Sequence, residues 1–231
     1  MRKRILDGRD EIAVGVSVAD GQAIERCLKA EDVTVHGHER LRVIHFDRRL
    51  PRTLNQVREQ EHALEVRVIE RSTAPDKVTL EVKRQLSDEL RHVELELPRR
   101  ALRAALRPNA LQDLAPDAPG DLVPVLGIEF TRRLFRSRAG WSVTLDRDLA
   151  FHRIDARMLE RTGQLALGVP DRFADGRVLV TVTTGGAVLP TWLEGVVRAS
   201  SPWNIVEEGF SLVAPRPSPR GPGPDLRLVL H

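Results

Sequence analysis

Two short segments between residues 63 and 86 constrain the fold of this chain more than any other part of it. Residues 64–68 (LEVRV) and 78–83 (VTLEVK) alternate apolar and polar side chains, and the spacer between them contains Pro75 and Asp76. Strict alternation over a short run is typical of a β-strand with one covered face, and such a spacer is typical of a hairpin loop. The pattern therefore predicts a β-hairpin with one apolar face. The opposite face carries charges of both signs: Glu65, Arg67, Glu81 and Lys83.

The positive charge of the chain is carried mainly by arginine. Of 231 residues, 30% are charged, and only four of the 36 basic residues are lysines, Lys3, Lys29, Lys77 and Lys83. Arginine stays protonated and binds phosphate or carboxylate groups through two parallel hydrogen bonds. The net charge of +3 is too small to indicate a nucleic-acid partner. With 41% hydrophobic residues, the chain can bury one large core or two small ones.

A single cysteine, Cys27, excludes an intrachain disulfide and favours a reducing compartment. We expect it to fill a small space in the core. No apolar run approaches the length of a membrane span, and the basic N-terminal residues are not followed by the apolar segment of a secretory signal. We therefore expect a cytoplasmic protein. His36 and His38 are expected in a solvated loop, and Trp192 and Trp203 as packing anchors.

The rest of the chain contains further alternating segments and a few helices. Strands are predicted at residues 11–18, 41–47, 92–97, 127–135, 141–146 and 177–184. Helices are predicted at residues 21–30, where Asp20 is the expected N-cap, at 98–107 and at 190–198. The sum is an α+β domain over residues 1–213, followed by a Pro/Gly/Arg-rich tail over residues 214–231.

Each predicted strand has one polar or charged face, and this leaves two architectures open. One is an antiparallel sheet with a face in water, which is common. The other is a barrel whose interior is charged and whose outside is packed under helices. The pattern alone does not separate the two.

Several segments, taken in order, resemble the VTC domain, which is the polyphosphate polymerase domain of the triphosphate tunnel (CYTH-like) superfamily. The match is best at TLEVKRQ (79–85), which is similar to the Glu-x-Lys-Arg strand of that family. The other matching segments are VIHFD (43–47), LEVRVIE (64–70), FTRRLF (130–135), WSVTLDRDL (141–149), VLVTVTTGGAVLPTWL (178–193) and GFSLV (209–213). The resemblance implies a closed antiparallel β-barrel, forming a tunnel, with short helices packed outside.

The resemblance also implies a basic tunnel that binds ATP or polyphosphate. Arg67, Lys83 and Arg132 would be the catalytic side chains, and together with Arg133 they would bind the substrate. Glu81 and Asp146 would hold a divalent metal, Mn²⁺ or Mg²⁺. Such a metal neutralises charge that develops during phosphoryl transfer. No nucleic-acid partner is expected, and work beside a membrane partner protein is compatible with the resemblance.

Several positions depart from the family pattern. Cations of the family are replaced by Ala13, Glu65, Ser142, Thr183 and Leu212, and its metal-binding glutamate by Thr181. A hydroxyl is a poor ligand for a hard dication, and fewer cations weaken the hold on a triphosphate. Two functions therefore stay open: a polyphosphate polymerase, or a catalytically inactive protein that binds a phosphate polyanion or a protein partner.

Overall fold

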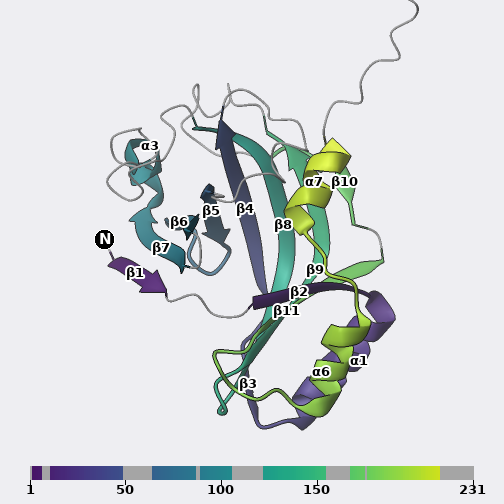
Figure 1. Ribbon diagram of the computed structural model, residues 1–231. Helices are drawn as coiled ribbons and strands as arrows, with labels where there is room; N and C mark the ends of the chain where they lie inside the picture. The colour runs from purple at the N-terminus through teal and green to yellow at the C-terminus, as the bar shows by residue number, and fades with distance from the viewer. Residues whose placement is uncertain are drawn as a thin grey trace, which may run out of the picture.

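A computed structural model describes residues 2–6, 11–48, 64–86, 89–105, 122–154, 167–174 and 176–213. Its strands form one antiparallel sheet in the order β1, β7, β6, β5, β4, β8, β9, β11, β2, while β3 pairs with β8 and β10 with β9 (Figure 1). The strands are β1 Arg2–Leu6, β2 Glu11–Ser17, β3 Val33–Val35, β4 Glu39–Arg48, β5 Leu64–Arg71, β6 Lys77–Leu86, β7 Glu89–Pro98, β8 Leu122–Ser137, β9 Ser142–Arg153, β10 Arg172–Phe173 and β11 Arg177–Thr183. The helices are α1 Val18–Ala30, a 3-10 turn Arg99–Ala101, α3 Leu102–Ala105, α6 Thr191–Ala199 and α7 Ile205–Val213. The α+β prediction is confirmed, and the predicted tail at 214–231 lies outside the described residues.

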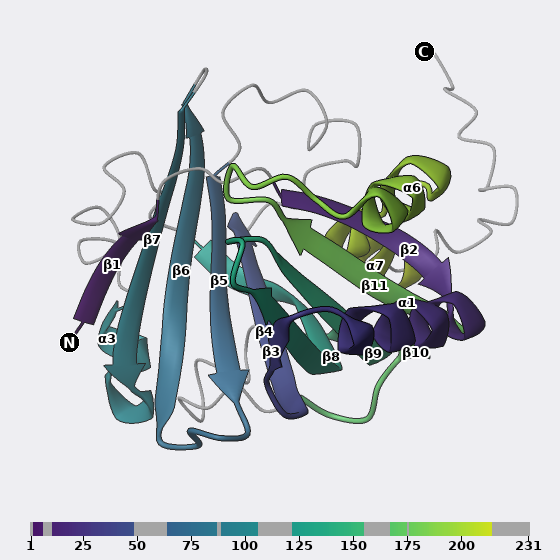
Figure 2. The same ribbon diagram turned by 90° about the horizontal axis from the view of Figure 1, so that it is seen from below.

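The sheet curls, but hydrogen bonds do not close it. Figure 2 shows β5, β6 and β7 in one wall, with β9, β11 and β2 turned away from it. Within the described residues, the two end strands β1 and β2 do not pair with each other. Strand β1 pairs with β7, and β2 pairs with β11. The predicted closed barrel is therefore not confirmed. The described strands form an open, curled sheet.

The register of the strands assigns the side chains to two faces. His45, Arg67, Glu81 and Glu94 are successive partners across β4, β5, β6 and β7, so these side chains share one face, called here the inner face. On the outer face, apolar residues of the same four strands pack around Leu102 of α3. Alternation along each strand therefore turns the charged residues inward as it buries their neighbours outside.

A second apolar group covers the outer face of β2, β8, β9 and β11. It packs against Ile24 and Leu28 of α1 and Leu193 of α6. Burial of one such side chain contributes about 1.5–3 kcal/mol. A third buried group, which includes Val43, Ile69 and Phe130, lies on the inner face beside the charged residues and packs against α7.

An irregularity where β8 pairs with β9 decides which side chains of β9 face inward. The register shifts along this pair, and Asp148 has a φ of 55°. A bulge of this kind adds a residue to one strand and changes the face of the side chains beyond it. Asp146 is consequently opposite Arg132, which the regular pairing of β8 with β4 places on the inner face, while Arg133 contacts α1 on the outer face.

Helix α1 begins earlier than the sequence predicts. Its N-cap is Ser17 rather than Asp20, because the extended Ser17 accepts a 3.1 Å hydrogen bond from the backbone N–H of Asp20. Asp20 lies in the first turn, where a carboxylate favours the helix dipole. Cys27 is exposed, contrary to the core position predicted for it, because Ile24 and Leu28 form the buried stripe and Cys27 lies beside it.

The predictions for the tryptophans and the loop histidines are confirmed. Trp203 is buried, and the half-buried Trp192 donates its indole N–H to a Glu31 oxygen at 2.8 Å. His36 and His38 are exposed in the loop between β3 and β4.

Helix α7 packs closely against β8 and β9 through Gly209. A Cβ atom at Gly209 would lie 2.8 Å from Phe151 and 2.9 Å from Leu126, which is too close for carbon atoms. Gly195 in α6 has no neighbouring atom within 4 Å of its added Cβ. The two helical glycines thus allow the same substitution to be compared at a closely packed position and at an open one.

Gly209→Ala is expected to lower the free energy of unfolding by about 1–2 kcal/mol, because α7 must move away from the sheet. Gly195→Ala is expected to raise it by up to about 1 kcal/mol, since alanine is the better helix former and has room. Urea unfolding of both variants would test this. A loss of stability in Gly195→Ala as large as that in Gly209→Ala would contradict the close packing of α7.

Candidate functional site

Arg67 on β5 lies at the centre of the charges on the inner face. Its Nε pairs with Glu81 on β6, and its Nη1 lies 3.6 Å from Glu65 Oε1. Nδ1 of His45 on β4 lies 3.4 Å from the same Glu65 oxygen. The side chains of Glu81 and Arg67 are 6% and 24% exposed, and attraction between shielded charges is stronger than at the surface. Arg67 therefore already has two carboxylate partners.

Arg132 on β8 makes the second buried pair of the inner face. Its Nε donates a 2.7 Å hydrogen bond to Oδ1 of Asp146, and its Nη2 donates another of 2.7 Å to Oδ2. The side chain of Asp146 is fully buried. The guanidinium also lies 5.1 Å from the ring centre of Phe130. This two-bond geometry is the strongest that arginine makes with a carboxylate, so it fixes both side chains.

The curl of the sheet brings the two arginines into one interior. Strand β2 is five strands away from β5 in the sheet order, yet the carboxylate of Glu11 on β2 acts on the pKa of Arg67 and of Arg132. Burial lowers the pKa of Arg132 and Asp146 raises it, while the charge of Arg67 lowers it further. Between exposed charges, such interactions are largely screened beyond roughly 10 Å. Strands β2, β5 and β8 therefore surround one charged interior.

The carboxylates of this interior are held in the charged form. Burial raises the pKa of Glu65, but Arg67 and His45 outweigh it and lower that pKa from 4.5 to about 2. Burial also raises the pKa of Glu81, and Arg67 lowers it well below its usual range. Each pKa is lower in the folded than in the unfolded chain, so folding is favoured above about pH 4.5 and this gain is lost as the pH falls.

Acid is therefore expected to destabilise the protein between about pH 4.5 and pH 2. Glu65 alone should contribute about 1–2 kcal/mol, a value reduced because its side chain is 37% exposed. Urea unfolding at several pH values, for the wild type and Glu65→Gln, would measure this. The variant should lose stability less steeply in acid, and equal slopes would contradict the assignment.

The predicted phosphate-binding residues divide between the two faces. The structure brings Arg67, Lys83 and Arg132 to the inner face, where Lys83 is half-buried and opposite Glu65. Arg133 lies on the outer face and pairs with Glu25 of α1. The structure therefore does not bring Arg133 together with the other three cations.

The predicted metal ligands Glu81 and Asp146 do not come together either. Both oxygens of Asp146 accept hydrogen bonds from Arg132, which leaves no carboxylate edge directed at an ion. The neighbouring inner side chains are Thr144 on β9, and Leu179 and Thr181 on β11. These residues do not fit a site for a hard dication, which prefers charged oxygen ligands.

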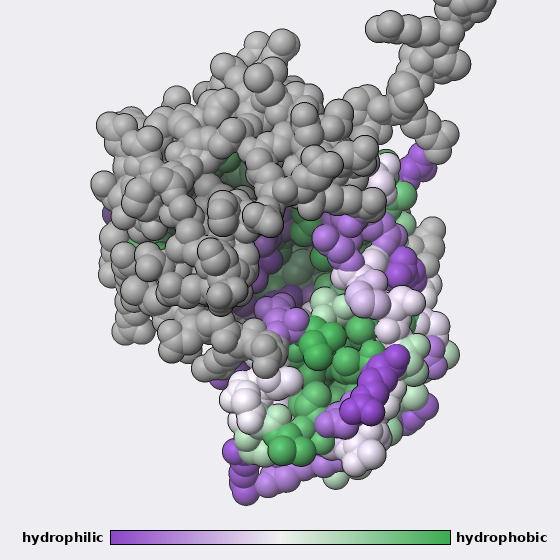
Figure 3. Space-filling view, viewed as in Figure 1, coloured by the Kyte–Doolittle hydropathy of each residue, from purple (hydrophilic) through white to green (hydrophobic). Residues whose placement is uncertain are grey.

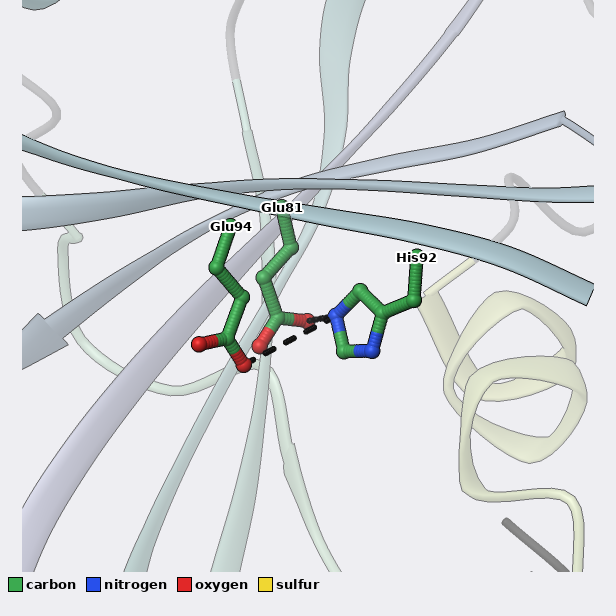
Figure 4. Close-up of side chains that lie close together, drawn as sticks. All are labelled: Glu81, His92 and Glu94. Atoms are coloured by element: carbon green, nitrogen blue, oxygen red, sulfur yellow. Dashed lines mark ion pairs between the residues drawn. The ribbon is translucent and has the colours of Figure 1, made fainter. Parts of the chain in front are cut away.

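Glu81 instead groups with two residues of β7 that the sequence prediction did not include, His92 and Glu94 (Figure 4). Nε2 of His92 lies 3.7 Å from Glu81 Oε2 and 3.7 Å from Glu94 Oε1. The alternation of residues 92–97 already placed His92 and Glu94 on the polar face of their strand. The missing information was which strand would lie beside it.

A network of arginines and glutamates lies on the outer face. Arg40 and Arg42 both bind Glu129, and Arg42 and Arg99 both bind Glu70. They line a recess of about 170 Å³. Because the two glutamates are buried and the three arginines are already paired with them, the network chiefly joins β4, β5 and β8.

A larger recess of about 700 Å³ lies between α1 and α6. Figure 3 shows apolar side chains gathered in the lower part of the view, where Figure 1 places these helices. Ile24, Trp192 and Val196 line the recess, and its charged lining residues are Asp20 and Arg177. One carboxylate and one guanidinium on an apolar surface do not fit a phosphate polyanion.

Among the described helices, none is both long enough and apolar enough to cross a membrane. No model of a known protein family matches the sequence. A comparison with curated proteins likewise finds no match.

Solved structures do match over most of the chain. The PH1819 protein of Pyrococcus horikoshii is 15% identical, with 87% of this chain and 99% of that chain covered and a TM-score of 0.48. HpAC1 of Hippeastrum, a candidate adenylyl cyclase with dominant triphosphatase activity, is 15% identical, with 87% and 96% covered and a TM-score of 0.47. A candidate adenylate cyclase of Vibrio parahaemolyticus is 14% identical, with 88% and 99% covered and a TM-score of 0.50. At such identity a likeness concerns the fold alone, and the chain shares its overall fold with the Vibrio parahaemolyticus protein.

Proposed function

We propose that the inner face binds a phosphate polyanion, either a nucleoside triphosphate or a polyphosphate chain. The observation that supports this most directly is the placement of Arg67 and Arg132, 24% and 32% exposed, on one face of the curled sheet together with Lys83. Guanidinium groups bind phosphate oxygens through paired hydrogen bonds, and a lysine adds a point charge. The VTC resemblance implies the same three residues in the same role.

Binding in this interior requires an exchange of partners. The carboxylates that face the three cations include Glu11, Glu65, Glu81 and Asp146. A phosphate chain must compete with these groups for the guanidinium donors. We therefore expect the affinity to be modest and to fall as salt screens the charges.

Polyphosphate synthesis is the activity that the resemblance implies, and we propose that it is impaired here. Phosphoryl transfer depends on metal and cations placed around the transferring group. Thr181 and Thr183 stand where the resemblance implies a glutamate and a lysine, and Asp146 is held by Arg132. We infer a protein that retains polyanion binding and has little polymerase activity.

Calorimetric titration with tripolyphosphate and ATP tests the binding proposal. Lys83→Gln is the informative variant, because it removes an inner cation while both buried arginine pairs stay intact. We expect about a tenfold loss of affinity, since one charge in a partly shielded site is worth about 1–2 kcal/mol. The matched control is Lys29→Gln in α1, whose lysine pairs with Glu25 on the outer face. Equal affinities of both variants and the wild type would argue against the inner face.

Incubation with ATP and either Mn²⁺ or Mg²⁺ tests the activity separately. We expect no polymer that an exopolyphosphatase degrades. Formation of such a polymer by the wild type, and its absence with Lys83→Gln, would identify an active polymerase and refute the impairment.

A structural or regulatory role without phosphate binding is the second candidate. It is favoured by the pairing of Arg67 with Glu81 and of Arg132 with Asp146. No heat on titration with ATP, tripolyphosphate or polyphosphate at low salt would support this role.

A further inference from the structure

We propose that Glu81, His92 and Glu94 form a binding site for a divalent transition-metal ion on the wall made by β6 and β7. Only Glu81 is shared with the pair for which the VTC resemblance implies a metal. Metal binding here needs no phosphate, so it can be tested independently of the proposed polyanion binding.

The ligand atoms are already close to the geometry that one ion requires. One nitrogen of His92 and one oxygen from each glutamate lie within 4.8 Å of one another, and Figure 4 shows the three side chains pointing toward a common point. Two ligands about 2.1 Å from one metal lie at most about 4.2 Å apart. The two 3.7 Å separations from His92 Nε2 are within this limit. Small rotations of the glutamates would complete the site.

The histidine nitrogen at the centre of the group has no other partner. Nε2 of His92 is buried from solvent and makes no hydrogen bond among the described residues. A separation of 3.7 Å from each carboxylate is too long for a hydrogen bond. Buried polar atoms normally make a hydrogen bond, so a nitrogen that has two carboxylates only at ion-pair distance is suited to a ligand bound between them.

The donor set indicates the kind of metal. Imidazole nitrogen suits Zn²⁺, Co²⁺ and other first-row transition metals, whereas Mg²⁺ and Ca²⁺ take mostly oxygen ligands. One nitrogen and two carboxylate oxygens on adjacent strands also leave coordination positions open. We therefore expect Zn²⁺ or Co²⁺ to bind much more tightly than Mg²⁺.

A metal at this site would change the surroundings of Arg67. Glu81 currently pairs with Arg67 and also lies beside His92. If an oxygen of Glu81 coordinates a metal, its ion pair with Arg67 becomes weaker. The guanidinium of Arg67 can then bind an anion more readily. If the proposed polyanion binding is also correct, Co²⁺ should then increase the affinity for tripolyphosphate.

Titration of the chelator-treated full chain with Co²⁺ tests the proposal. The protein carries Cys27→Ser, because the exposed thiol of Cys27 is itself a metal ligand. We expect one Co²⁺ per chain, a visible absorption band that Zn²⁺ abolishes, and no competition from equal Mg²⁺. Glu94→Gln and His92→Ala should each weaken Co²⁺ binding by about 10- to 100-fold.

His38→Ala is the matched control, because His38 is exposed in a loop and should leave Co²⁺ binding unchanged. Near-ultraviolet circular dichroism verifies the fold of each variant, and His92→Gln replaces His92→Ala if the latter fails to fold. Absence of Co²⁺ binding, or equal binding by the wild type, Glu94→Gln and the folded His92 variant, would overturn the proposal. Co²⁺ binding without any binding of tripolyphosphate would support this site and count against the proposed function alone.

Discussion

Replacement of Arg132 by alanine is expected to lower the free energy of unfolding by about 3–5 kcal/mol. The reason is its partner Asp146, which is fully buried and receives two 2.7 Å hydrogen bonds from Arg132. Without the guanidinium, a charged carboxylate would remain in the interior with neither water nor a counter-charge. Urea unfolding at pH 7 measures the loss.

The neighbouring residue supplies the control for this prediction. Arg133→Ala should cost only about 1 kcal/mol, because Glu25 keeps its contacts with Arg147 at 2.6 Å and Lys29 at 2.8 Å. The double variant Arg132→Met with Asp146→Leu should recover most of the lost stability, because it removes both charges together. Equal losses from Arg132→Ala and Arg133→Ala would mean that the buried pair is not on the inner face as described.

The strands of this fold could be predicted from sequence because their alternation is local. Residues 64–68 and 78–83 each contain enough period-two pattern to define a strand and its faces, and the short loop between them fixes the register. The charged face of the hairpin followed directly from this. Helix α1 was less well predicted, because Ser17 and Asp20 are both good N-caps and the pattern does not rank them.

The arrangement of the site depends on contacts between distant residues and could not be predicted in the same way. The sequence shows Arg132 and Arg133 on opposite faces of one strand, and only the pairing of β8 with the distant strand β4 shows that the first faces inward and the second outward. The open edges of the sheet were also missed, because the local pattern does not say which strand β1 will join. For the same reason Glu81 was separated from His92, although both lie on polar faces of predicted strands.

Glu65→Gln is expected to raise the affinity for tripolyphosphate by about tenfold. Glu65 lies 3.6 Å from Arg67 and directly opposite Lys83, so its charge offsets both cations that the ligand would contact. Removal of one charge near such a site is worth about 1–2 kcal/mol at an effective dielectric constant near 20, and the side chain is 37% exposed, which keeps the effect toward the lower value. Calorimetric titration at low and moderate salt measures the change.

Asp32→Asn is the control for Glu65→Gln, because Asp32 is an exposed carboxylate paired with Arg138 away from the inner face. Both variants change the net charge by the same amount, so a rise in affinity common to both would reflect long-range attraction rather than the site. A rise confined to Glu65→Gln, and diminished by added salt, would place the polyanion beside Arg67. No rise in Glu65→Gln, although the wild type binds, would mean that the ligand is held elsewhere, since a carboxylate beside both Arg67 and Lys83 would then have no influence on it.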